Sequence, residues 1–307
     1  MIKNIMRILK SKIGILFISS LTVFGIARIY FRMTDDFRIA NMTYEIAHNK
    51  NWEIPQISSN EMNDLNQILD QKFYYLGKGA QSYVFSSDDG LYVLKFFKFK
   101  HLRPSLFLNA LPSMPPFENY VTKEVKRKDR KLKSVFNGYR LAYEIHKQGS
   151  GLVFIHLNKT SNINKTVTVF DKIGMSHEID LDQNVFLIQR KGETLRTVMT
   201  DLLDRKDLKL AKLRIRQIFD LYISEYQKSA YDHDHGIMHN TGFVADEPIH
   251  LDVGKFSSDS KISQREIYKD DLQIIYRKID LWMKNNYPAY QEEIVKDMHE
   301  KLLEVTL

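Results

Sequence analysis

The chain of 307 residues is 43% hydrophobic and 27% charged, which excludes a largely disordered protein and allows one large domain or two lobes with sizeable cores. It contains no cysteine, so disulfides, thiolate metal ligands and a cysteine nucleophile are excluded. Its net charge of +7 is uneven, because the segment KEVKRKDRKLK, from Lys123 to Lys133, holds seven basic and two acidic residues.

The basic segment 123–133 is compatible with three kinds of surface. It can be the solvated face of a helix, it can contact anionic lipid head groups, or it can bind nucleic acid. It lacks the interleaved aromatic residues on which nucleic-acid bases stack. We therefore do not expect nucleic acid as a partner.

Residues 1–32 form a hydrophobic N-terminal segment. Four basic residues and no acidic ones come first: Lys3, Arg7, Lys10 and Lys12. Ile13 to Ala27 then carry no charge, but this stretch rises only ~22 Å as a helix, less than the ~30 Å hydrocarbon core of a bilayer. The segment reaches that thickness if Arg28 extends its charge to the interface and the helix continues through Phe31. We expect a single-pass membrane anchor, and hence the membrane as a partner.

Two alternatives to an anchor fit the same residues. A cleaved signal peptide has this layout, and Gly25 and Ala27 supply the small residues before a cleavage site. A buried helix is the other alternative. Four basic residues precede the apolar stretch, and three, Arg28, Arg32 and Arg38, follow it. The positive-inside rule therefore leans toward a cytoplasmic N-terminus and an exported C-terminal domain. The expected location is membrane-anchored or exported.

Strands are predicted in the first half of the chain, after residues 33–69, where we expect a linker with a short helix. From Phe73, the sequences FYYLGKGAQSYVF and LYVLKFFKF flank a polar turn and predict antiparallel strands. Four prolines between residues 104 and 116 predict a loop, and a basic helix then extends to about His146. Further strands are expected at 152–157, 166–170 and 184–189.

Helices dominate the rest of the sequence. Residues 207–230 place apolar side chains at helical spacing, and two amphipathic helices follow at about 263–285 and 288–305. A short strand, PIHLDVG, precedes these last two. Strands first and helices afterwards predict an α+β fold in two lobes.

A glycine-bearing turn and a lysine give the first sign of chemistry. Gly77, Gly79 and Val84 lie in GKGAQSYV, between two expected strands. Glycines there let backbone N–H groups approach phosphate oxygens closely, although a plain hairpin would have the same residues. Lys95 follows eleven residues after Val84 in an apolar strand, and a charge buried there needs an anionic partner.

These residues resemble the protein-kinase-like superfamily, in which the loop G-x-G-x-x-G-x-V covers ATP and the lysine of V-A-I-K holds the α- and β-phosphates. The resemblance implies that Gly77, Gly79, Ser82, Val84 and Lys95 bind ATP. Ser82 stands where the family has its third glycine.

The second half of the resemblance lies in residues 231–256, YDHDHGIMHNTGFVADEPIHLDVGKF. The family has a catalytic Asp, an Asn five residues later and the Asp of D-F-G, and the last two bind magnesium. Asp252 begins the sequence D-V-G in the D-F-G position and Asn240 precedes it by twelve residues, so the resemblance implies that both bind Mg²⁺. Asp234 is the implied catalytic residue, although it lies six residues before Asn240, and Asp232 is the alternative.

Three further parts of the family pattern stay open. Aligning His235-Gly236-Ile237 with the H-G-D of small-molecule kinases would place Ile237 at the catalytic position and would favour an inactive protein. The glutamate that pairs with the strand lysine is either Glu144 or Glu124. The hinge that meets adenine is implied at the strand 186–189.

The resemblance covers about residues 70–256. Only 53 residues follow Gly254 and no A-P-E sequence occurs, so the C-terminal part resembles the trimmed lobes of small-molecule, sugar or lipopolysaccharide kinases. The implied fold is a kinase-like domain at 70–307, with an N-lobe at about 70–189 and a C-lobe at about 190–307.

Three functions are compatible with these residues. The first is ATP- and Mg²⁺-dependent phosphotransfer to an unknown phosphoacceptor, and the second is a pseudokinase that binds nucleotide or a partner without catalysis. The third is a metal-dependent hydrolase, in which His233, His235 and His239 join Asp232 and Asp234 as ligands. We expect phosphotransfer.

Overall fold

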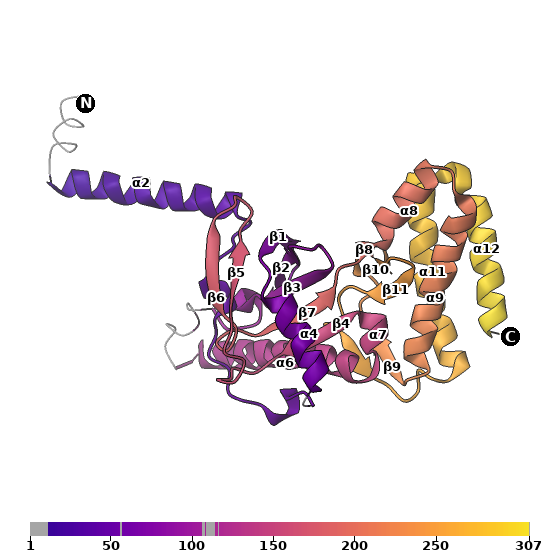
Figure 1. Ribbon diagram of the computed structural model, residues 1–307, viewed down its shortest axis with the longest axis horizontal. Helices are drawn as coiled ribbons and strands as arrows, with labels where there is room; N and C mark the ends of the chain where they lie inside the picture. Colours follow the sequence, from indigo (N-terminus) through magenta and orange to yellow (C-terminus); the bar gives the residue numbers. More distant parts are fainter. Residues whose placement is uncertain (1–11, 56, 106–107, 109–113, 116, 307) are drawn as a thin grey trace.

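A seven-stranded sheet and a cluster of helices lie side by side in the computed structural model, which describes residues 12–55, 57–105, 108, 114–115 and 117–306 (Figure 1). The fold is therefore mixed α+β, as predicted. The loop predicted at 104–116 lies largely outside the described residues.

The sheet is built from the sequence between residues 73 and 190. Its strands are β1 (Phe73–Lys78), β2 (Ser82–Ser87), β3 (Tyr92–Phe97), β4 (Leu152–His156), β5 (Thr166–Phe170), β6 (Ser176–Asp180) and β7 (Phe186–Arg190). They lie in the order β4-β7-β3-β2-β1-β5-β6, and all neighbours are antiparallel except β1 and β5. The predicted strands are confirmed, and β6 is an addition.

The two faces of the sheet have separate cores. On one face Leu94 and Phe96 of β3 pack in a cluster with Leu65 of helix α4 (Ser59–Leu69). On the other face Phe97 packs against Phe136 of the long helix α6 (Phe117–Ile145). Because successive strand residues point to opposite faces, Lys95 shares the face of Phe97 and is directed toward the side that α6 covers.

Helix α2 (Lys12–Met33) projects from the rest of the molecule (Figure 1). Its apolar side chains are exposed, as for Leu16 (69%) and Phe24 (63%), so the helix is not a core helix of this fold. Of the described helices, it alone has the length and composition to cross a membrane, over Gly14–Met33. A helix of 22 residues rises ~33 Å, which matches a bilayer core. A signal sequence meets the same criteria.

Residues 33–69 pack on the sheet, although we expect a linker from their composition. They form α3 (Ile39–Met42), the 3-10 helix η1 (Lys50–Trp52) and α4. Phe37 and Trp52 are almost fully buried, at 2% and 4% exposure. Single aromatic residues in a polar sequence thus fix this segment to the domain.

The helical part follows β7. Its elements are β8 (Glu193–Thr194), α8 (Leu195–Asp204), α9 (Leu208–Tyr226), β9 (Ala230–Asp232), α10 (Ile237–Asn240), β10 (Thr241–Val244), β11 (Glu247–His250), β12 (Phe256–Ser258), α11 (Arg265–Asn286) and α12 (Pro288–Thr306). Its core includes Phe219 of α9 and Leu272 of α11. The predicted helices α9, α11 and α12 are confirmed, while α8 is an addition.

A small sheet of three strands lies where the chain passes from β7 into the helical part. β8 and β11 flank β10 in this sheet. A Cβ atom at Gly242 would lie 1.9 Å from the carbonyl oxygen of Glu193, so only glycine allows β10 to pair with β8 this closely.

Candidate active site

Lys95 lies where the sheet meets the helical part. Its Nζ atom donates a hydrogen bond to the carbonyl oxygen of Leu251, at 2.6 Å, across 156 positions of sequence. Burial lowers the pKa of Lys95, and the nearby charge of Asp252 raises it. The strand lysine and the D-V-G segment, singled out separately in the sequence, are thus adjacent in space.

The Asp252 carboxylate is held from two sides and still exposed. Its Oδ1 atom accepts hydrogen bonds from the Tyr139 hydroxyl, at 2.9 Å, and from the Gly254 backbone N–H, at 3.0 Å. The residue as a whole is exposed. Oδ2 has no hydrogen-bond or ion-pair partner among the described residues, which leaves one carboxylate oxygen for a ligand.

Tyr139 comes from α6, which approaches the D-V-G segment closely. A Cβ atom at Gly138 would lie 2.8 Å from the carbonyl oxygen of Val253, so glycine permits this contact. Burial and the charge of Asp252 raise the pKa of Tyr139 well above its ordinary value. Tyr139 is therefore a neutral hydroxyl that donates to the carboxylate at neutral pH.

The two glutamates considered as partners of Lys95 point elsewhere. Glu144 pairs with Arg140, at 3.3 Å, and Glu124 pairs with Arg127, at 2.8 Å. No described carboxylate forms an ion pair with Lys95. The contribution of α6 to this site is the Tyr139 hydroxyl.

Asn240 is placed beside Asp252 by the β10–β11 hairpin. Thr241 pairs with His250 in that hairpin, and the Leu251 N–H donates to the carbonyl oxygen of Asn240, at 2.7 Å. Residue 240, which accepts this bond, and residue 252, which follows its donor, therefore leave the hairpin at the same end. The Asn240 side chain has no hydrogen-bond partner in the described part of the chain.

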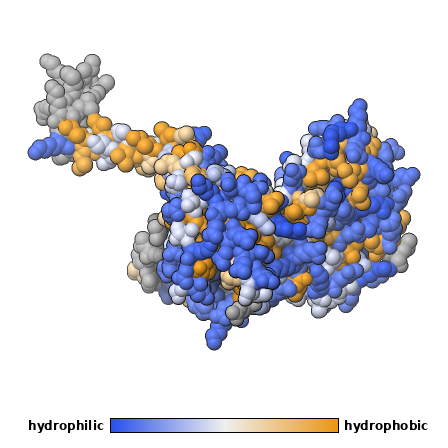
Figure 2. Space-filling view, in the orientation of Figure 1, coloured by the Kyte–Doolittle hydropathy of each residue, from blue (hydrophilic) through white to orange (hydrophobic). Residues whose placement is uncertain are grey.

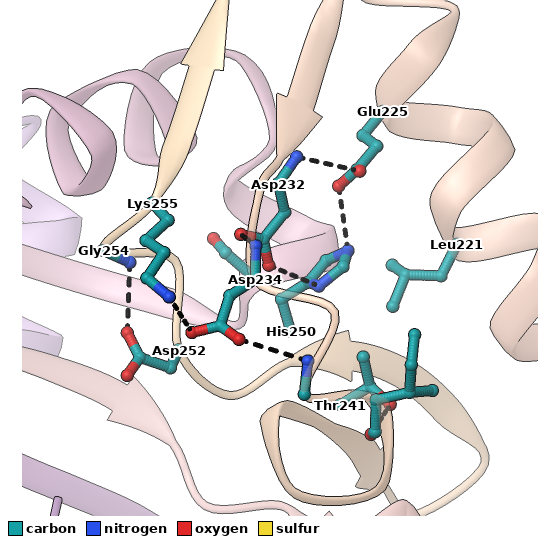
Figure 3. Close-up of polar contacts among 12 residues, drawn as sticks. Leu221, Glu225, Asp232, Asp234, Thr241, His250, Asp252, Gly254 and Lys255 are labelled. Atoms are coloured by element: carbon teal, nitrogen blue, oxygen red, sulfur yellow. Dashed lines mark hydrogen bonds and ion pairs between the residues drawn. The ribbon is translucent and has the colours of Figure 1, made fainter. Parts of the chain in front are cut away.

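The two candidate catalytic carboxylates have different surroundings, which Figure 3 shows. The Asp234 side chain is 32% exposed and pairs with Lys255, at 3.0 Å. The Asp232 side chain is fully buried, and its Oδ1 accepts the Asp234 backbone N–H, at 2.9 Å. Burial raises the pKa of Asp232 to about 7. The Asp232 carboxylate stabilises the backbone turn at residues 232–234. Of the two carboxylates, Asp234 is the one that a solute can reach.

A buried polar cluster lies behind these residues. His250 Nε2 is 3.0 Å from Glu225 Oε2, and His250 Nδ1 is 3.8 Å from Asp232 Oδ2, with all three side chains inaccessible. Burial alone would lower the pKa of His250, but the carboxylates of Glu225 and Asp232 raise it. Burial raises the pKa of Glu225 as well, but His250 lowers it; we assign the proton of the pair to His250.

Three of the buried residues have the spacing of metal ligands: His146, Glu225 and His250, whose donor atoms lie within 4.8 Å of one another. Two positive groups oppose an ion there. One is protonated His250, and the other is the Lys228 ammonium, 3.4 Å from His146 Nδ1. Since the three residues are also closed to solvent, they cannot serve a hydrolytic reaction on a bound substrate.

The histidines considered as hydrolase ligands are not grouped. His233 Nε2 lies 2.8 Å from the Ser257 hydroxyl, and His235 Nε2 lies 2.5 Å from Asp271 Oδ1. His239 is exposed and has no side-chain partner among the described residues. The 232–239 segment therefore does not present its histidines to one ion in this conformation.

The glycine turn joins β1 to β2. Gly77 pairs with Val84, and the Gly79 N–H donates to the carbonyl oxygen of Ser82, at 3.0 Å. A Cβ atom at Gly77 would meet nothing within 4 Å, so a ligand has open space above this residue. Val84 in turn pairs with Lys95 across β2 and β3, which places the turn and the lysine on adjoining strands.

The strand implied as the hinge is β7, which pairs with β3. The Gln189 side chain is buried and donates to the carbonyl oxygens of Ser150, at 2.6 Å, and His250, at 2.9 Å. These bonds fix β7 to the β11 end of the helical part.

Comparisons with known proteins add little to this geometry. No protein-family model matches the sequence, and no curated protein matches it. A solved structure described as a co-crystal of WbdD and the kinase inhibitor LY294002 matches with a TM-score of 0.32 and 12% sequence identity. That match covers 74% of this chain but only 44% of the WbdD chain. A similarity this low carries no argument, so the proposal below rests on the site.

Proposed function

We propose that the protein is an ATP- and Mg²⁺-dependent phosphotransferase with a two-lobed, kinase-like domain. The observation that carries the proposal is the proximity of Lys95 and Asp252, which come from the two parts of the molecule. A buried lysine beside an exposed carboxylate suits a nucleotide–magnesium complex, because the cation meets phosphate oxygens and the carboxylate meets the metal.

The residues present fit a magnesium ion. Asp252 offers a free carboxylate oxygen, and the Asn240 amide lies at the same end of the β10–β11 hairpin. Bound Mg²⁺ would neutralise charge on the phosphates. The protein's own contribution is to hold Asp252 with Tyr139 and Gly254, and to keep Lys95 out of water, where its charge acts more strongly.

For the acceptor hydroxyl we propose Asp234 over Asp232. A residue that orients an acceptor must be reachable, and only Asp234 is partly exposed. Lys255 and the Gly236 backbone N–H contact the Asp234 carboxylate and orient it. The chemical class of the acceptor, whether protein, sugar or lipid-linked molecule, is not specified by these residues.

The test is Mg²⁺-dependent ATP binding and turnover by the full chain in detergent. Asp252→Ala should reduce turnover at least about 100-fold with the fold intact, because an essential ligand is lost. Asp88→Ala, an exposed carboxylate in the β2–β3 turn, is the matched control and should be unchanged. Full turnover in Asp252→Ala would overturn the proposal.

A second candidate is a pseudokinase that binds nucleotide without transfer. The residue five positions before Asn240 is His235, and its ring is bound to Asp271, so the family's interval does not end on a carboxylate. Ile237, the other alignment, is 1% exposed. ATP binding that depends on Lys95 and Asp252, with no turnover against any acceptor tested, would favour this candidate.

A further inference from the structure

A basic hollow lies at the end of α2, where this helix joins the domain. Its volume is about 620 Å³. Nine residues line it: Arg28, Ile29, Phe31, Arg32, Asp35, Asp36, Arg38, Lys78 and Lys100. Five are basic and two acidic, so the walls carry an excess of positive charge. The hollow comprises the last turns of α2, the end of β1 and the 3-10 helix η2 (Phe99–His101).

The two aspartates of the hollow already form ion pairs with three of its basic residues, Arg38, Lys78 and Lys100. Asp36 pairs with Arg38, at 2.7 Å, and with Lys100, at 2.9 Å. Asp35 pairs with Lys78, at 3.4 Å, and with Lys172, which lies outside the hollow, at 3.1 Å.

Arg28 and Arg32 are the unpaired charges of the hollow. Neither has an ion-pair partner in the described part of the chain, and both are exposed. They are four residues apart, so their side chains lie on one face of α2. Two guanidinium groups on one face can bind the oxygens of a single phosphate.

The position of these arginines along α2 indicates the source of the phosphate. The apolar stretch Gly14–Met33 matches the hydrocarbon core in length, and Arg28 and Arg32 fall in its last two turns. When α2 spans a bilayer, their long side chains extend outward from the hydrocarbon to the level of the lipid phosphates. In Figure 2 the hydrophobic surface of α2 gives way to hydrophilic surface where the domain begins.

The basic segment 123–133 of α6 supports the same orientation. α6 begins on the side of the domain from which α2 projects (Figure 1). Lys128 donates to the carbonyl oxygen of His101, at 3.0 Å, so this basic helix contacts η2 next to Lys100. Basic groups around one helix end add attraction to an anionic membrane surface.

We propose that the hollow binds the phosphate head group of an anionic phospholipid, with Arg28 and Arg32 as its principal ligands. The hollow does not include Lys95 or Asp252, although its Lys78 lies in the glycine turn, and the proposed lipid binding does not depend on the proposed phosphotransfer. It requires only that α2 remain attached and lie in a bilayer.

The experiment is native mass spectrometry of the full chain, purified in detergent and supplied with phosphatidylglycerol or phosphatidylcholine. We expect phosphatidylglycerol adducts on the wild type, at least about fivefold fewer on the double variant Arg28→Gln, Arg32→Gln, and few phosphatidylcholine adducts on either. The double variant Arg196→Gln, Lys209→Gln removes the same charge from exposed, unpaired residues of α8 and α9, and should bind as the wild type does.

Three outcomes would overturn the proposal. Equal phosphatidylglycerol binding by the wild type and the Arg28, Arg32 variant would remove these residues from any site. An equal loss of phosphatidylglycerol binding in both double variants would show that binding depends on net charge and not on Arg28 and Arg32. Competition by millimolar inorganic phosphate, with equal retention of both lipids, would assign the hollow to free phosphate and not to a lipid.

Discussion

Two groups of polar side chains lie at or near the D-V-G segment, and they differ in their access to solvent. The first group consists of Lys95, Asp252 and Tyr139, and the Asp252 carboxylate in it is exposed and has one free oxygen. His250 and Glu225 form a pair that is closed to solvent. The first group is accessible to a ligand, and the second is not. In our proposal, similar residue types serve binding in one place and support the fold in the other.

The largest effect is expected from the closed group. Glu225→Ala leaves His250 buried without its nearest carboxylate, which should lower the free energy of unfolding by about 3–5 kcal/mol. Urea unfolding of the full chain in detergent measures this loss. Glu292→Ala, an exposed glutamate on α12, is the control and should change stability by less than about 0.5 kcal/mol. A loss below 1 kcal/mol for Glu225→Ala would show that the pair is not a supporting element.

The accessible group should respond in binding more than in stability. Lys95→Met keeps most of the side-chain volume but removes the charge, so ATP affinity should fall at least about tenfold, or ~1.4 kcal/mol. Calorimetric titration with Mg²⁺-ATP measures it. Lys209→Met, an exposed lysine of α9, serves as the control. Unchanged affinity for Lys95→Met would remove this lysine from the nucleotide site.

A third prediction separates the two groups by metal content. Purified protein should contain well under one equivalent of transition metal, because protonated His250 and Lys228 already supply positive charge beside Glu225. Elemental analysis of the full chain tests this expectation. Stoichiometric zinc that is lost in His146→Ala and retained in His239→Ala would assign the buried cluster to a metal and contradict our account of it.

The sequence predicts the accessible group better than the closed one. The strands around the glycine turn follow from alternation, and Lys95 is conspicuous because it interrupts an apolar strand. Tyr139 falls on the apolar face of a predicted helix, but spacing alone does not show that its hydroxyl meets Asp252. That contact depends on how closely α6 packs, which Gly138 decides.

The closed group has no signature in the sequence. His146, Glu225 and His250 come from three separate segments of the chain, and by residue type glutamate usually lies at the surface while histidine is intermediate. Their burial follows from tertiary packing, which no local pattern specifies. The same holds for Phe37 and Trp52, whose polar surroundings predict a linker while their rings fill gaps in the core.

A smaller effect is expected where α6 meets the accessible group. Tyr139→Phe removes the hydroxyl that donates to Asp252 but keeps the ring in place, so the carboxylate loses a bond worth about 1.5 kcal/mol or less. The Mg²⁺ concentration needed for half-maximal ATP binding should change severalfold, with little change in the unfolding midpoint. Tyr143→Phe, on the same helix, is the control. Identical Mg²⁺ dependence in both variants would make Tyr139 a packing residue only.

The smallest effect concerns His235, whose contact with Asp271 ties the 232–239 segment to α11. The hydrogen bond to Asp271 raises the pKa of His235, and Asp232 acts in the same direction, while burial and Lys278 oppose it. A pKa raised in the folded state means that protonation stabilises the fold. This contribution is complete below the ordinary histidine pKa of 6.5 and is lost as the pH rises through the folded value. The stability difference between the wild type and His235→Gln should therefore shrink between about pH 5.5 and about pH 8.5, on either side of the ordinary histidine pKa. Urea unfolding at several pH values measures this difference.

His239→Gln, which changes an exposed histidine four residues away, is the control and should show no such trend. A difference that grows with pH would mean that folding lowers the pKa of His235 and holds its ring neutral, which would contradict this account.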